Sequence, residues 1–127
     1  MKKILILLLL MVSTNVFAEW TPVDTSSDGT QTAYLDIDTI KRKGNKVSMW
    51  MMIDYKTVQE GGFLSAVSRF EYDCEERTSR MLDFVWYKGN MMSKDVLFGD
   101  SNMKLEARSI SPSSMDETIL KIVCSKK

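Results

Sequence analysis

Residues 46–56 read KVSMWMMIDYK, and this stretch decides the fold. Apolar side chains occupy every second position, namely Val47, Met49, Met51, Ile53 and Tyr55. Because successive side chains of a β-strand point to opposite faces, this spacing predicts a strand with one strongly buried face.

The two following stretches continue the pattern. After Gly61 and Gly62, one face of a second predicted strand carries Leu64, Ala66, Ser68, Phe70, Tyr72 and Cys74. Cys74 is therefore expected on the core side of the sheet. Residues 79–87 predict a third strand with apolar groups on both faces, Leu82, Phe84 and Trp86 against Met81, Val85 and Tyr87. A strand of this kind is typical of the middle of a sheet.

Shorter elements flank these strands. Residues 34–36 look extended. A charged turn at 41–45, ending in Gly44-Asn45, predicts a hairpin that leads into the strand at 46–56. Residues 19–23 form a short apolar start, and the polar stretch 24–31 predicts a loop. Further along, residues 96–98 and 105–110 predict two more short strands.

The C-terminal segment predicts a helix. Ser114 with Glu117 three residues later is a capping box, and acidic residues suit the positive end of a helix. Ile119, Val123 and Cys124 then fall along one stripe. We expect this stripe to lie on the sheet.

The N-terminus has the pattern of an export signal. Lys2 and Lys3 precede an apolar run from Ile4 to Val12, and small residues lead to Ala18. The run is shorter than the ~18 residues that a membrane-spanning helix needs, so we expect residues 1–18 to be a cleaved signal peptide rather than an anchor. No cysteine follows the cleavage point to carry a lipid. Residues 19–127 should form a single exported domain, periplasmic, secreted or at the cell surface.

Export decides how the two cysteines are interpreted. The periplasm and the exterior are oxidising, so Cys74 and Cys124 are expected to form a disulfide, worth roughly 4 kcal/mol in the chain-entropy estimate. The alternative, two free thiols in a redox or metal pair, disagrees with their spacing and compartment. The predicted fold class is α+β, with an antiparallel sheet of five to six strands and one C-terminal helix packed on a face and tethered by the disulfide.

Composition excludes most catalytic classes. The chain has no histidine, the commonest general base and metal ligand. Without Lys2 and Lys3, 15 basic residues stand against 17 acidic ones, so there is no drive toward nucleic acid. Glu71 and Asp73 share a strand face and could form an acid-base or cation site, but a solvated face is the simpler interpretation. The methionines suggest soft-metal binding only weakly, because strand alternation explains Met49 and Met51. We expect no catalytic residues and no metal.

Basic side chains form the one candidate surface for a partner. They are Lys41, Arg42 and Lys43 in the charged turn, with Arg77 and Arg80 after the first cysteine. Such charges often serve solubility and protect sheet edges. The same residues could bind an acidic partner.

Several stretches in this order resemble the surface-adhesin protein E family of Gram-negative bacteria. They are Tyr34-Leu35-Asp36, Gly44-Asn45 leading to Trp50 and Asp54, Tyr72-Asp73-Cys74 followed by Arg77 and Arg80, and Ile110 to Ser114 running to Val123-Cys124. The resemblance implies a six-stranded antiparallel sheet with a disulfide-tethered helix. It also implies a non-enzymatic role in binding host matrix or plasma proteins such as vitronectin, laminin and plasminogen, with haem binding by a dimer.

The favoured function is therefore an exported, non-enzymatic binding module for host matrix, plasma or envelope proteins, acting without a cofactor unless haem binds as the resemblance implies. The alternative is a periplasmic inhibitor or envelope-stress accessory protein that acts on an enzyme such as lysozyme. A structural subunit is the third possibility.

Overall fold

The computed structural model describes residues 19–125, so the predicted signal peptide at residues 1–18 lies outside the described residues. Within that part of the chain, eight strands join one antiparallel sheet in the order β1-β2-β4-β5-β6-β7, with β3 pairing with β4 and β8 with β6. The strands are β1 (Trp20–Thr25), β2 (Gln31–Asp36), β3 (Lys41–Lys43), β4 (Lys46–Tyr55), β5 (Ser65–Asp73), β6 (Thr78–Tyr87), β7 (Val96–Asp100) and β8 (Arg108–Ser109). The helix α2 spans Met115–Ser125, and 3-10 turns occupy Ile37–Thr39 and Asn90–Met92.

Strands β4 and β5 confirm the alternation read from the sequence. Val47 lies opposite Tyr72, and Met49 lies opposite Phe70. Residues that pair across a sheet share a face, so the two predicted apolar faces form one surface. Val47, Met49 and Tyr72 are almost completely buried there.

Strand β6 lies between β5 and β7, as expected for an inner strand, but its two faces differ from the prediction. Asp83 pairs with Arg69 while Met81 pairs with Phe70, which leaves Leu82 as an extra residue in a β-bulge. A bulge shifts the alternation by one residue. Met81 therefore faces the same side as Phe84 and Trp86, where the sequence had placed Leu82.

Several predicted boundaries are corrected in the same way. Lys41, Arg42 and Lys43 belong to a strand, β3, and only Gly44-Asn45 turns before β4. The predicted loop at 24–31 is shorter, because β1 continues to Thr25 through a bulge. The predicted strand at 105–110 shrinks to the two residues of β8, while the remainder is irregular.

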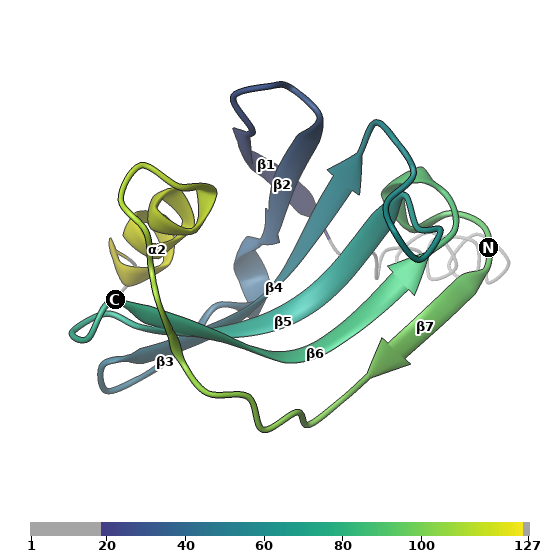
Figure 1. Ribbon diagram of the computed structural model, residues 1–127. Helices are drawn as coiled ribbons and strands as arrows, with labels where there is room; N and C mark the ends of the chain where they lie inside the picture. The colour runs from purple at the N-terminus through teal and green to yellow at the C-terminus, as the bar shows by residue number, and fades with distance from the viewer. Residues whose placement is uncertain (1–18, 126–127) are drawn as a thin grey trace, which may run out of the picture.

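The helix packs on the concave side of the sheet. Figure 1 shows the sheet curling so that β1 and β2 stand beside α2, which covers only one end of it. Ile119, Leu120 and Val123 are buried against the cluster of Ala33, Leu35, Val47, Met49, Met51 and Tyr72. Burial of a large aliphatic side chain is worth about 2 kcal/mol, so this stripe attaches the helix.

The predicted disulfide is present. Cys74, directly after β5, and Cys124 in the last turn of α2 are bonded, with their Cα atoms 5.8 Å apart. The fold class is thus confirmed as an antiparallel sheet with a C-terminal helix tethered by this bond. Among residues 19–125, no helix is long and apolar enough to cross a membrane.

Candidate binding groove

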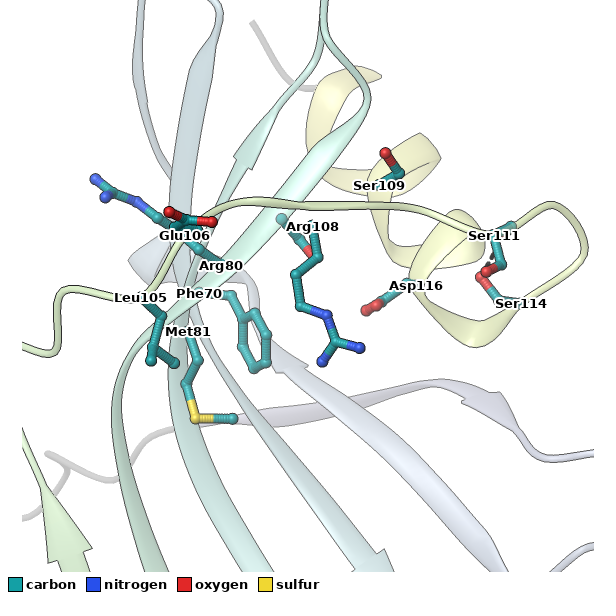
Figure 2. A pocket seen from close by; sticks show the side chains of 11 residues that line it. Phe70, Arg80, Met81, Leu105, Glu106, Arg108, Ser109, Ser111, Ser114 and Asp116 are labelled. Atoms are coloured by element: carbon teal, nitrogen blue, oxygen red, sulfur yellow. Dashed lines mark hydrogen bonds between the residues drawn. The ribbon is translucent and has the colours of Figure 1, made fainter.

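The concave face that α2 leaves uncovered forms a groove. The segment 105–111 crosses above β6 and walls off a hollow of about 620 Å³, which ends at the first turn of α2. In Figure 2, Phe70, Met81, Leu105, Arg108 and Asp116 point into this hollow, whereas Arg80 and Glu106 point away from it. The volume lies in the range of ligand sites, about 300 to 1,000 Å³.

The floor of the groove continues along the sheet and is apolar. A second hollow of about 390 Å³ shares Phe70, Met81, Ser114 and Asp116 with the first. At its far end Phe63 stacks on Trp86, with ring centroids 4.3 Å apart. Phe98 of the open edge strand β7 continues this aromatic row and is 56% exposed. Together the two hollows form one long apolar surface, which we call the concave groove.

A capped helix N-terminus positions the acidic residue of the groove. The N–H of Glu117 donates to Ser114 Oγ at 3.2 Å, as the predicted capping box requires. Glu117 in turn accepts from the N–H of Ser113, not from Ser114 itself. This cap fixes the first turn of α2 and thereby holds Asp116 against the sheet.

Asp116 is engaged from the sheet side. The hydroxyl of Tyr72 donates a 2.8 Å hydrogen bond to Asp116 Oδ1. Burial raises the pKa of Tyr72 above its ordinary value, and the negative charge and hydrogen bond of Asp116 raise it further. Tyr72 is therefore a fixed neutral donor.

Arg108 is the cation that points into the groove. It lies in β8 opposite Ser79, whose side chain is buried on the concave side. In the part of the chain that the structure describes, Arg108 forms no ion pair. The sequence did not single out Arg108 or Leu105, because no local pattern indicates which way an irregular segment turns its side chains.

The five basic residues predicted to form one surface lie on separate parts of the fold. Arg77 pairs with Glu117 at 2.9 Å beside α2, and Arg80 pairs with Glu71 at 3.0 Å on the convex face. Arg42 donates to the backbone oxygen of Cys124 at the end of α2. Lys41 and Lys43 are exposed on the short strand β3. The partner-binding role of these residues stays a prediction.

The carboxylates considered for chemistry have structural partners. Glu71 pairs with Arg80, and Asp73 accepts from the N–H groups of Glu75 and Glu76 in the β5–β6 turn. In residues 19–125, no group of three or more His, Cys, Asp or Glu side chains could hold a metal ion.

Haem has few potential ligands in the groove. The chain lacks histidine, and both cysteines form the disulfide. The remaining candidates among the lining side chains are thioethers such as Met81 and the hydroxyl of Tyr55. Tyr55 has no side-chain hydrogen bond within the described range that would orient it. Haem binding therefore stays an expectation from the family resemblance.

The chain resembles known proteins in both sequence and structure. A sequence model described as surface-adhesin protein E matches residues 20–125. No curated protein is similar enough in sequence to count as a relative. The selenomethionine form of Haemophilus influenzae protein E is similar in structure, with a TM-score of 0.64 at 11% identity over 89% of this chain and 91% of that one.

Two further solved structures agree in fold. Protein E from non-typeable Haemophilus influenzae has a TM-score of 0.58 at 11% identity, over 88% of this chain and 79% of that one. Another structure of Haemophilus influenzae protein E gives 0.57 at 12% identity, over 88% of both chains. At these identities the likeness establishes the fold alone.

Proposed function

Because the chain belongs to the surface-adhesin protein E family, we propose that it is an exported, non-enzymatic module that binds proteins of the host matrix, of plasma or of the bacterial envelope. The concave groove is the binding surface in this proposal. The observation that carries it is a long apolar hollow, open to solvent, in a family described as surface adhesins.

The side chains of the groove support binding rather than catalysis. Exposed apolar surface rimmed by polar groups is typical of protein interaction sites. Leu105 at the rim is 51% exposed, although it is a large aliphatic side chain. The hydroxyl of Ser114 donates to the backbone oxygen of Ser111 and accepts from the N–H of Glu117. It therefore stabilises the start of the helix and is not placed as a nucleophile.

The predicted basic residues are part of the same proposal in a weaker role. Arg42 contacts the end of α2, Lys41 and Lys43 flank it on β3, and Arg77 pairs with Glu117. None of the β3 residues lines the groove. Their contribution would be long-range attraction of an acidic partner, which salt screens. Binding of haem, and formation of a dimer, are further properties that the family resemblance suggests for this chain.

The experiment has two arms. Intact cells are treated with protease and compared with cells after osmotic shock, to find the side of the outer membrane on which the protein lies. The exported protein is then immobilised and exposed to vitronectin, laminin and plasminogen, with Arg77→Ala/Arg80→Ala and Leu105→Ser as variants. Lysozyme is included to test the alternative role as an enzyme inhibitor.

Cleavage on intact cells, with retention of a matrix or plasma protein that Leu105→Ser weakens, is the expected result. Release only on osmotic shock, with inhibition of lysozyme and no retention of host proteins, would instead favour the periplasmic inhibitor. Equal capture by wild type and by Arg77→Ala/Arg80→Ala would remove Arg77 and Arg80 from the binding surface.

A further inference from the structure

Arg108 is an exposed cation of the concave groove that forms no ion pair among residues 19–125. Its backbone is held by β8, which pairs with Thr78 and Ser79 of β6, so the position of the residue is fixed by the sheet. Figure 2 shows its side chain directed into the hollow, over Phe70 and toward the first turn of α2. Among residues 19–125 its guanidinium has no carboxylate partner.

The other charges near this hollow are already engaged or directed elsewhere. Asp116, the acidic side chain that faces Arg108, accepts a hydrogen bond from the hydroxyl of Tyr72 and forms no ion pair with any residue of the described segment 19–125. Arg80 is held by Glu71, and Figure 2 shows that Arg80 and Glu106 point out of the hollow. Within the described range 19–125, the groove therefore presents Arg108 as its available cation, and the five guanidinium N–H donors suit a carboxylate.

Apolar side chains surround that cation. Phe70 and Met81 form the floor beneath it, and Leu105 forms the rim. A guanidinium beside apolar surface is less hydrated than one in open water, which strengthens its attraction for an anion. Arginine is also one of the residue types that are enriched at the energetically dominant positions of protein interfaces.

The geometry points to a partner segment in which an Asp or Glu is flanked by aliphatic or aromatic residues: we propose that its carboxylate binds Arg108 while its apolar neighbours fill the groove over Phe70, Met81 and Leu105. This inference rests on the proposed function and names the chemistry of the partner. A peptide segment suits the open, elongated shape, since small-molecule sites enclose most of their ligand.

A random twelve-residue peptide library, displayed on phage, tests the proposal on the exported protein with its disulfide formed. Peptides enriched on the wild type are synthesised, and their affinities are measured for wild type, Arg108→Gln, Leu105→Ser and Lys104→Gln. Lys104 is a matched control, because it is an exposed cation four residues away that lines a hollow with Arg69 and Leu82 on the other face. Thermal unfolding of each variant checks that the exposed substitutions leave the fold intact.

We expect acidic residues next to apolar ones in the enriched peptides, and affinities about fivefold to tenfold weaker on Arg108→Gln but unchanged on Lys104→Gln. Replacing the acidic residue of the peptide by its amide should cost the same factor on the wild type and nothing on Arg108→Gln. The proposal is wrong if the enriched peptides show no preference for acid, if no peptide is enriched, or if Arg108→Gln binds them as well as wild type.

Two controls separate this outcome from a failure of the proposed function. Capture of vitronectin, laminin or plasminogen that Arg108→Gln leaves unchanged would retain the binding module and reject the acidic partner segment. Dodecanoate is tested by the change in tryptophan fluorescence of wild type and of Trp86→Phe, because Trp86 lines the groove whereas Trp20 and Trp50 do not. Saturable binding of dodecanoate, with no enrichment of peptides, would assign the groove to a small amphipathic anion and overturn the proposal.

Discussion

The hydroxyl of Tyr72 in β5 donates a 2.8 Å hydrogen bond to Asp116 Oδ1 in the first turn of α2, across 44 residues of sequence. This bond joins the sheet to the start of the helix, and the disulfide between Cys74 and Cys124 joins the sheet to its end. The helix is thus fixed at both ends. The groove depends on this arrangement, because the segment 105–111 is stretched between β6 and the start of α2.

Tyr72→Phe should lower stability by about 1 kcal/mol at neutral pH, because Asp116 loses its donor while the ring stays in place. It should also change the alkaline profile. Since the pKa of Tyr72 is raised above 10.0 in the folded protein, its contribution is full below pH 10 and declines as the pH rises. Urea unfolding between pH 7 and 11 measures both effects.

The matched control for this variant is Tyr55→Phe. Burial also raises the pKa of Tyr55, but no acidic side chain contributes there. We expect the Tyr55 variant to keep most of the alkaline decline and the Tyr72 variant to lose most of it. Unchanged stability at pH 7 in Tyr72→Phe, together with an unchanged alkaline slope, would contradict the role of the bond to Asp116.

Ser114→Ala should destabilise the protein by about 1 kcal/mol, because the N–H of Glu117 loses its cap. Ser109→Ala, at an exposed site in β8, serves as the control and should be close to neutral. Chemical denaturation of both variants measures the difference. Equal midpoints for the two variants would contradict the capping role.

Glu117→Gln should remove part of the acid dependence of stability. The N–H of Ser113 lowers the pKa of Glu117 below 4.5, and Lys121 and Arg77 add to this effect. Its stabilising contribution is therefore present above pH 4.5 and is lost as the pH falls through the lower folded pKa. Thermal unfolding from pH 7 to pH 3 should show a shallower fall in the variant, and a parallel fall would count against this assignment.

Replacing both Cys74 and Cys124 by Ser should cost up to about 4 kcal/mol, because the cross-link closes a loop with a sequence separation of 50 residues. The measurement is urea unfolding of the variant and of wild type, with and without reductant. Reduced wild type and the double variant should unfold at the same midpoint. A midpoint that reductant leaves unchanged in wild type would mean that the tether is unimportant for stability.

The sequence predicted the parts of this structure that periodicity and chemistry control. Strict alternation in residues 46–56 was enough to orient Val47 and Met49, and alternation in β5 placed Cys74 on the side where Cys124 arrives. The capping pattern located the start of α2 at Ser114. In each case a local rule and the tertiary packing agree.

The rest depends on long-range geometry that no local pattern encodes. The bulge at Leu82 reverses the alternation in β6, and only pairing with Arg69 and Phe70 reveals it. Arg108 and Leu105 lie in a segment of little regular structure, so their side-chain directions follow from where the chain crosses the sheet. The basic residues were visible in the sequence, but the carboxylates that hold Arg77 and Arg80 come from strands and helices elsewhere.

The central claim is that partners bind in the concave groove. A photo-reactive benzoylphenylalanine in place of Leu105 at the rim, compared with the same group at exposed Ser27 in the β1–β2 turn, tests it most directly. After irradiation of the exported protein with plasma and matrix proteins, the account predicts covalent adducts from position 105 and few from position 27. Adducts from position 27 alone, or equal yields from both, would contradict it.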